Sequence, residues 1–258
     1  MLEIAETLLS VSQPILWTGF AVFVRLSAMT FVLPGFGEAS VPARIKLAIA
    51  FSFTLILTPA ITVEFPQPEF LSAVFLLAPE VIAGLFFGLM LRFFIFALQI
   101  AGSIAAQSTS LSQIFGGSAG VDPQPAIGRT LVIAGLALAA LLGLHVQIAR
   151  YMLIGYELIP FGVWASSEIV ANLGVQEVSR AFLLGFTLAS PFVIASLLYN
   201  ITLGVINRAM PQLMVSFVGA PAITAGGLFL FFLTAPMLLG LWTDAFGAFM
   251  SRPFGGMR

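Results

Sequence analysis

Residues 131–138 read Leu-Val-Ile-Ala-Gly-Leu-Ala-Leu, a run in which every residue is apolar. A strand of a membrane barrel alternates apolar with polar residues, because one face meets lipid and the other faces the lumen. This run does not alternate, and similar apolar segments recur along the chain. Of its 258 residues, 60% are hydrophobic and only 8% are charged. The sequence therefore predicts an all-α, polytopic integral membrane protein.

Six segments approach the roughly 20 apolar residues that a helix needs to cross a bilayer. We expect them at about 14–33, 47–63, 70–100, 130–144, 181–206 and 213–242. Pro191 lies inside the fifth segment, and Gly219, Pro221 and Pro236 interrupt the sixth, so some helices are expected to be broken. Long connections are expected at 101–129, a polar loop, and at 144–180. No composition shift divides the chain, so 1–258 is predicted to be one helical domain.

Composition also excludes several classes of function. A soluble domain carries about 25% charged residues. The net charge of −1 gives no basic footprint for nucleic acid, and the absence of Cys removes thiolate metal sites and thiol catalysis. His145 is the only histidine, and no phosphate loop or nucleophile motif is present. We expect no enzymatic activity, no metal and no cofactor.

Three ionisable residues lie inside apolar segments: Arg25, Glu80 and Arg92. Such residues suggest a functional site by default, here a proton or ion relay. The alternative is a structural ion pair or a contact with a partner subunit. Glu80 and Arg92 are about three turns apart on one helix, too far for a direct pair. Because isolated charges make a poor relay, we favour contacts with partner subunits.

Small residues recur at four-residue spacing, as in Gly84 and Gly88, in Gly185 and Ala189, and along 135–143. Such stripes allow helix backbones to approach closely. They predict tight helix packing and carry no information about cargo.

The most unusual stretch is 106–125, Ala-Gln-Ser-Thr-Ser-Leu-Ser-Gln-Ile-Phe-Gly-Gly-Ser-Ala-Gly-Val-Asp-Pro-Gln-Pro. Irregular backbone near a membrane must be buried in protein or line a water-filled cavity. The stretch is therefore interpreted either as a re-entrant or pore-lining loop or as a flexible surface loop. The apolar Leu111, Ile114 and Phe115 favour the buried loop.

The order of prolines, glycines and arginines along the chain carries a resemblance. Arg25 is followed by Pro34-Gly35-Phe36-Gly37 and Val41-Pro42-Ala43-Arg44. Gly143-Leu144-His145 then precedes Pro160-Phe161-Gly162, and Asn207-Arg208-Ala209-Met210-Pro211-Gln212 follows. Over about residues 15–240 this pattern resembles the FliR family, the flagellar branch of the type III secretion export-gate proteins.

The resemblance implies a subunit of the export gate in the flagellar basal body of the bacterial inner membrane. It implies assembly with FliP and FliQ into a helical ring that FlhB joins, and passage of unfolded flagellar proteins. Several apolar helices would then pack on neighbouring subunits. Arg208, Pro211 and Gln212 are expected at helix-packing or partner contacts, like Arg25, Glu80 and Arg92.

A loop that helps to close the channel is also implied by the resemblance. Gln107, Asp122 and Pro123 are similar to the family pattern at this loop, whereas 108–121 depart from it. The expected plug side chains are Leu111, Ile114 and Phe115, with Gly116 and Gly117 as a hinge. An apolar constriction of this kind closes a pore by excluding water.

Other functions remain alternatives at this point. A virulence-secretion counterpart of the same family is one of them. A small-solute secondary transporter is the alternative from another class, and it predicts convergent polar groups on broken helices. A membrane enzyme would need a nucleophile, a base or a metal set, and the sequence contains none of these patterns.

Overall fold

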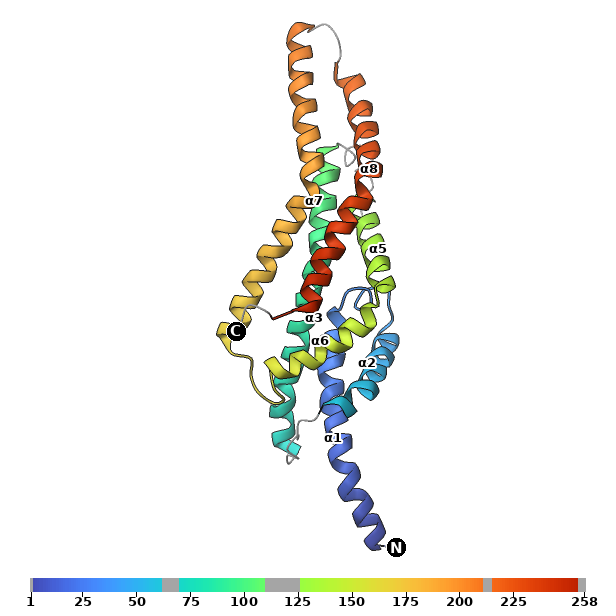
Figure 1. The fold of residues 1–258 in the computed structure, drawn as a ribbon, viewed down its shortest axis with the longest axis vertical. Coiled ribbons are helices and arrows are strands. Elements are labelled where there is room, and N and C mark those ends of the chain that lie inside the picture. Colours follow the sequence, from blue (N-terminus) through green and yellow to red (C-terminus); the bar gives the residue numbers. More distant parts are fainter. Residues whose placement is uncertain (1, 62–69, 110–125, 211–214, 255–258) are drawn as a thin grey trace. The chain divides into compact units, whose positions relative to one another are not determined.

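The computed structural model describes residues 2–61, 70–109, 126–210 and 215–254. In these residues the chain forms α-helices and one short 3-10 helix, with no strand. The α-helices are α1 (Leu2–Val32), α2 (Ala43–Leu57), α3 (Phe70–Ser108), α5 (Ala126–Leu141), α6 (Leu144–Leu158), α7 (Ser167–Ala209) and α8 (Val215–Ser251), and η1 is Thr58–Ala60 (Figure 1). The predicted all-α class is confirmed.

Five helices are long and apolar enough to cross a membrane, and a sixth candidate arises if α5 and α6 count as one broken span. The expected segments correspond to α1, α2, α3, α5, α7 and α8. The predicted polytopic character is therefore confirmed at the level of length and composition.

Local signals explain where several helices begin and end. Ser166 accepts a hydrogen bond from the backbone N–H of Ile169 (3.1 Å) and so caps the first turn of α7. Arg208 lies in the last turn of the same helix, where its charge offsets the negative end of the helix dipole. Gly143, with φ +77°, takes the left-handed conformation that separates α5 from α6.

The bounds of two expected connections are wrong. The predicted loop 101–129 is helical at both ends, since α3 continues to Ser108 and α5 begins at Ala126. The predicted connection 144–180 contains all of α6 and the start of α7. Helix α6 carries charged and polar residues such as Arg150 and Glu157, so a search for continuous apolar runs misses it.

Proline does not break the long helices. Pro191 lies inside α7, and Pro221 and Pro236 lie inside α8, yet each helix is assigned as one continuous element. A proline removes one backbone donor, and a long apolar helix tolerates this when neighbouring groups satisfy the freed carbonyl. The expected interruption of the sixth segment is therefore wrong.

The described helices group into two compact units. Unit 1 comprises residues 1–92 and 143–177, and unit 2 comprises 93–142 and 178–258. Helices α3 and α7 each contribute to both units. The organisation of the chain as one domain stays a prediction.

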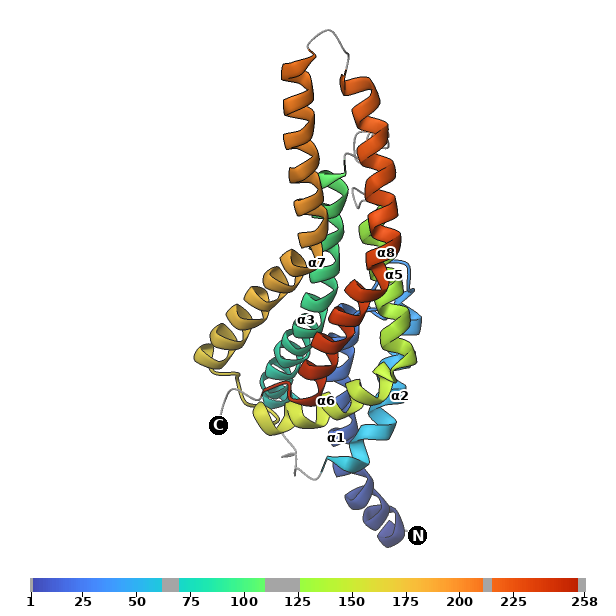
Figure 2. The same cartoon turned by 45° about the horizontal axis from the view of Figure 1, so that its top comes forward.

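Unit 1 is built around the crossing of α1 with α3. Helix α2 lies along α1 in both views (Figures 1 and 2). The core consists of side chains that α1, α3 and α6 bury together, among them Val22, Leu26, Phe87, Leu91 and Tyr151. Because three helices contribute, a polar side chain at this crossing is shielded from lipid and water alike.

Unit 2 has its core between α3, α5, α7 and α8, and α5 lies beside α8 (Figures 1 and 2). Trp242 is 1% exposed and donates its indole N–H to the carbonyl oxygen of Phe94 at 2.8 Å. Its ring stacks on Phe246, with ring centroids 5.3 Å apart. An indole buried in an apolar core requires such a partner for its polar N–H group.

Candidate functional site

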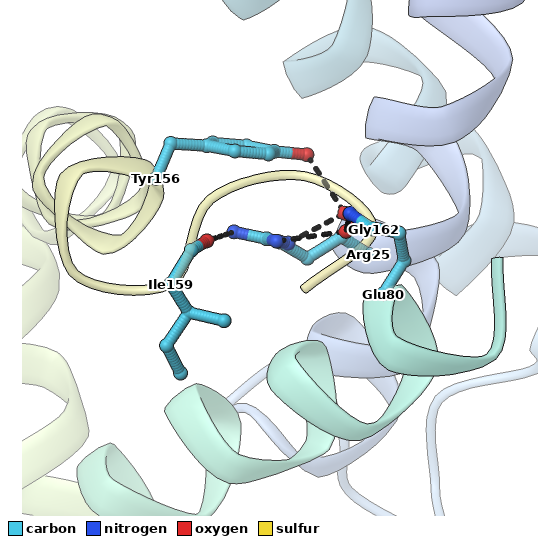
Figure 3. Close-up of polar contacts among 5 residues, drawn as sticks. All are labelled: Arg25, Glu80, Tyr156, Ile159 and Gly162. Atoms are coloured by element: carbon cyan, nitrogen blue, oxygen red, sulfur yellow. Dashed lines mark hydrogen bonds and ion pairs between the residues drawn. The ribbon is translucent and has the colours of Figure 1, made fainter. Parts of the chain in front are cut away.

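Two of the three intramembrane charges meet inside unit 1. Arg25 on α1 donates from Nε to Oε2 of Glu80 on α3 at 2.7 Å, and from Nη2 to Oε1 at 2.9 Å (Figure 3). Both side chains are 0% exposed. The pair is therefore bidentate, the geometry in which a guanidinium and a carboxylate bind each other most strongly.

The chain between α6 and α7 completes this cluster. Arg25 Nη1 donates to the carbonyl oxygen of Ile159 at 3.0 Å, and the backbone N–H of Gly162 donates to Oε1 of Glu80 at 3.0 Å. Figure 3 shows the ring of Tyr156 lying over the guanidinium, with Arg25 Cζ 3.8 Å from the ring centroid. We call Arg25, Glu80, Tyr156, Ile159 and Gly162 the buried cluster.

The buried cluster satisfies its own charges. Every contact just described joins two of three parts of unit 1, namely α1, α3 and the end of α6 with the connection that follows it, so the cluster fixes these parts to one another. A buried charge that is paired and fully hydrogen-bonded is poorly suited to a relay, which needs a group free to exchange a proton or ion. The arrangement acts as a structural lock.

This geometry makes Arg25 and Glu80 a helix-packing contact within the chain, and their contact with a partner subunit stays a prediction. Each side chain is covered completely by its own chain, so no atom of either is accessible to another subunit in this conformation. The physical reason is the crossing of α1 and α3, which brings residues 55 positions apart in the sequence into direct contact.

Glycines make this crossing tight. A Cβ at Gly84 would lie 2.2 Å from the carbonyl oxygen of Arg25, and one at Gly88 would lie 2.8 Å from that of Met29. Only a residue without a side chain fits at either point. The small-residue stripe on α3 therefore packs directly against α1, as its spacing indicates.

Arg92, the third intramembrane charge, lies at the other end of the α1–α3 contact. It donates to the carbonyl oxygen of Val32 at 3.2 Å and has Glu38 Oε1 at 3.6 Å. Both charged side chains are partly exposed, 22% for Arg92 and 35% for Glu38. Arg92 holds the end of α1 to α3, and contact with a partner subunit there stays a prediction.

The end of α3 just before the expected channel loop is anchored in unit 2. Thr109 is 3% exposed, and its carbonyl oxygen accepts a hydrogen bond from Thr224 Oγ1 on α8 at 3.4 Å. A Cβ at Gly227 would lie 2.2 Å from Thr109 Cγ2, so α8 and this end of α3 are in close contact. Gln107, the next-to-last residue of α3, is exposed.

The remaining expected channel and packing residues are only partly described. Arg208 is exposed in the last turn of α7. The following expected residues lie outside the described part of the chain: Leu111, Ile114, Phe115, Gly116, Gly117, Asp122, Pro123, Pro211 and Gln212.

Sequence reasoning missed Tyr156 and gave Gly162 no role in a site. Both residues lie in the stretch that was expected to be a connection. Gly162 belongs to the Pro160-Phe161-Gly162 motif, which is the sequence signal for this position. The structure gives the reason for a glycine there, a positive φ of +69°. Tyr156 carries no comparable signal, because a tyrosine on a helix is usually a packing residue.

A metal centre is not supported in the described ranges. No group of three or more His, Asp or Glu side chains there could hold a metal ion. His145, the single histidine, is exposed at the start of α6.

Comparison with known families places the chain. The model of the bacterial export proteins, family 1, matches residues 16–249, which include every helix of both units at least in part. The chain belongs to this family. The residues of the buried cluster and of the glycine crossing lie within the matched range.

Relatives of this export protein carry a single name. The flagellar biosynthetic protein FliR of Caulobacter vibrioides is 33% identical, over 87% of this chain and 91% of the relative. FliR of Bacillus subtilis is 29% identical over 78% of this chain and 79% of the relative. FliR of Escherichia coli is 25% identical over 85% and 84%. With its apolar helices, this export protein is a membrane-embedded component of the flagellar export apparatus.

Proposed function

We propose that the chain forms part of the channel through which unfolded flagellar proteins cross the bacterial inner membrane. In this proposal it assembles with FliP and FliQ, FlhB joins the assembly, and the complex lies in the flagellar basal body. The family match and the FliR relatives support the export role. The chain has no catalytic step of its own in this proposal and needs no cofactor.

One observation carries the assembly. Helices α7 and α8 leave large apolar side chains uncovered over much of their length, for example Leu198 at 62% and Phe232 at 76% exposed. A folded chain that exposes so much apolar surface requires lipid or other protein to cover it. Neighbouring subunits of a helical assembly would provide that cover.

The alternative, a small-solute transporter, has less support. It predicts broken helices whose ends converge on a polar site near the middle of the membrane. In the described residues, α7 and α8 run through their prolines without a break. The buried cluster is closed by its own hydrogen bonds, which leaves none of these groups directed at a solute.

Closure of the channel is assigned to 106–125. Leu111, Ile114 and Phe115 would form the apolar constriction, with Gln107, Asp122 and Pro123 at its ends. Gly116 and Gly117 would act as the hinge. The anchored end of α3 at Thr109 supports this proposal, because a plug that moves requires a fixed base.

The closure is tested by Gly117→Pro and by deletion of 112–120. We expect raised ion leak from the deletion, because the apolar constriction is gone, and impaired export from the proline, because the hinge is stiffened. Normal closure and normal export in both variants would refute this part of the proposal.

The assembly is tested by co-expression with FliP and FliQ in mild detergent, with an affinity tag on this chain only, followed by native mass spectrometry. We expect a stable complex that contains several copies of the partners. A monodisperse chain that binds neither partner would contradict the proposal. Solute uptake by the chain alone in liposomes would then favour the transporter.

A further inference from the structure

Two basic residues of the sequence motifs are exposed on unit 1. Arg44 ends the Val-Pro-Ala-Arg motif, and His145 ends Gly-Leu-His; both side chains are exposed. Among the described residues neither makes an ion pair or a side-chain hydrogen bond. Lys46 differs, since it is buried and donates to the carbonyl oxygen of Gly37 at 3.0 Å.

Arg44 and His145 line the same groove in unit 1. The groove has a volume of about 520 Å³, and most of its remaining wall is one face of α2. Ile45, Ala48 and Ile56 are on that face, at intervals of three and eight residues that keep them on one side of a helix. No carboxylate is among the lining residues.

We propose that this groove binds one anionic phospholipid, with its phosphate between Arg44 and His145 and an acyl chain along α2. A guanidinium fits two phosphate oxygens at once, and an imidazole N–H donates a further hydrogen bond. The start of α2 adds positive potential, since Pro42 provides no side-chain cap for the free backbone N–H groups there.

The dimensions fit one leaflet of a bilayer. Eleven residues separate Ile45 from Ile56, which on a helix corresponds to about 16 Å. Half of the hydrocarbon core is about 15 Å thick. A chain lying on this face would therefore reach from the headgroup level to the middle of the bilayer.

The distribution of charged and apolar side chains in the groove favours a lipid over a protein helix as its occupant. Arg44 lies at the start of α2, and the rest of the α2 wall is apolar apart from Ser52, which matches a charged head on an apolar tail. A partner helix would place polar groups at intervals along its length and would require a carboxylate opposite Arg44. The inference requires only that the chain is embedded in a membrane, so it does not depend on the proposed channel.

The test measures lipid retention by native mass spectrometry of the full-length chain in detergent. The probes are phosphatidylglycerol and phosphatidylcholine with identical acyl chains. We expect the chain to retain phosphatidylglycerol at least tenfold better. Arg44→Gln and His145→Gln should each weaken that retention roughly fivefold, the effect expected of one basic group beside an anionic headgroup.

Ala48→Trp tests the apolar wall without removing a charge, because the indole fills the groove. It should lower retention of phosphatidylglycerol as strongly as Arg44→Gln does. Two matched controls lie outside the lining: Arg150→Gln, which removes an exposed charge from α6, and Leu55→Trp, which enlarges a side chain that is 62% exposed on α2. Neither control should change retention, and circular dichroism reports whether each variant is folded.

Three results would overturn the inference. Equal retention of the two lipids by the unchanged chain would show that the groove does not select an anionic headgroup. Displacement of phosphatidylglycerol by millimolar inorganic phosphate would indicate a site for free phosphate. Loss of the lipid when the chain assembles with FliP and FliQ would assign the groove to a partner subunit.

Discussion

At the scale of single residues, losing one member of a buried ion pair such as Arg25–Glu80 affects stability far more than replacing both members together. Arg25 and Glu80 are both removed from water, and their mutual attraction offsets the desolvation of each charge. If one member is lost, the other remains buried without its partner. The free energy of folding of unit 1 therefore depends on both side chains being present.

Glu80→Ala is expected to lower the free energy of unfolding by about 3–5 kcal/mol, because it leaves the Arg25 charge buried and unpaired. Thermal unfolding of the purified chain in detergent, followed by circular dichroism, measures this. The matched control is Glu38→Ala, which removes the partly exposed partner of Arg92 and should change stability by about 0–1 kcal/mol. Equal effects of the two variants would contradict the structural role of the buried cluster.

Gly162 is expected to be sensitive to a single added methyl group. Its φ is +69°, and a Cβ would also lie 2.8 Å from Leu76 Cδ2. Gly162→Ala should therefore lower the free energy of unfolding by about 1–2 kcal/mol, the penalty for an L-residue in the left-handed region.

Gly174→Ala is the matched control for Gly162→Ala. Gly174 lies within α7, and among the described residues no atom outside its own helix backbone is within 4 Å of an added Cβ. Alanine is the better helix former, so this variant should gain about 0.5–1 kcal/mol. Stabilisation by both alanines would mean that the backbone at Gly162 is not constrained as described.

Sequence reasoning identified two of the five residues of the buried cluster. Arg25 and Glu80 are identifiable because a charge inside an apolar segment is rare. Their pairing was not predictable, since it depends on a crossing of helices 55 residues apart in the sequence. Tyr156 was out of reach for a further reason, because the helix that carries it was not expected.

At the scale of elements, hydropathy predicts the apolar helices and misses the amphipathic one. The ranges expected for the first three segments agree with α1, α2 and α3 over most of their length, because those helices have few polar residues. Helix α6 has one face buried in unit 1 and one face exposed, which dilutes its mean hydropathy. The prolines led to a different error, because they suggested breaks in α8, which is continuous.

The crossing of α1 and α3 is expected to fail if Gly84 gains a side chain. In Gly84→Ala the new methyl group would meet the backbone of Arg25 at 2.2 Å, and a backbone atom cannot move aside unless the whole helix shifts. We expect a loss of about 1–3 kcal/mol, typical of overpacking. Thermal unfolding in detergent measures the loss.

Gly226→Ala provides the control for that crossing. Gly226 lies in α8, and the part of the chain that the structure describes places no atom within 4 Å of an added Cβ outside the helix's own backbone. The variant should be neutral or slightly stabilising. A neutral Gly84→Ala would show that α1 and α3 are farther apart than the structure has them.

At the scale of the whole molecule, the main buried polar contacts of the described residues lie within each unit, while large apolar side chains are left outside. Arg25 and Glu80 pair within unit 1, and the indole N–H of Trp242 donates to Phe94 within unit 2. By contrast, Phe232 is 76% exposed on α8. A chain with this distribution completes its apolar contacts only with lipid or with other subunits.

Phe232→Ser tests whether lipid or a partner subunit covers this face of α8. If a partner subunit packs on this face of α8, loss of the aromatic ring from the contact should weaken co-purification with FliP and FliQ by about 30-fold, corresponding to roughly 2 kcal/mol. The free energy of unfolding of the isolated variant should lie within about 0.5 kcal/mol of that of the unchanged chain, because the ring contributes little to the chain's own core.

Leu188→Ser is the contrasting variant, since Leu188 is 0% exposed in unit 2. It should destabilise the isolated chain itself by about 2–5 kcal/mol, because it removes buried apolar atoms and adds a hydroxyl to the core. Co-purification should then fall only to the extent that the chain unfolds. If Phe232→Ser leaves co-purification unchanged while Leu188→Ser behaves as stated, lipid covers this face of α8, and the contact with partner subunits must lie elsewhere on the chain.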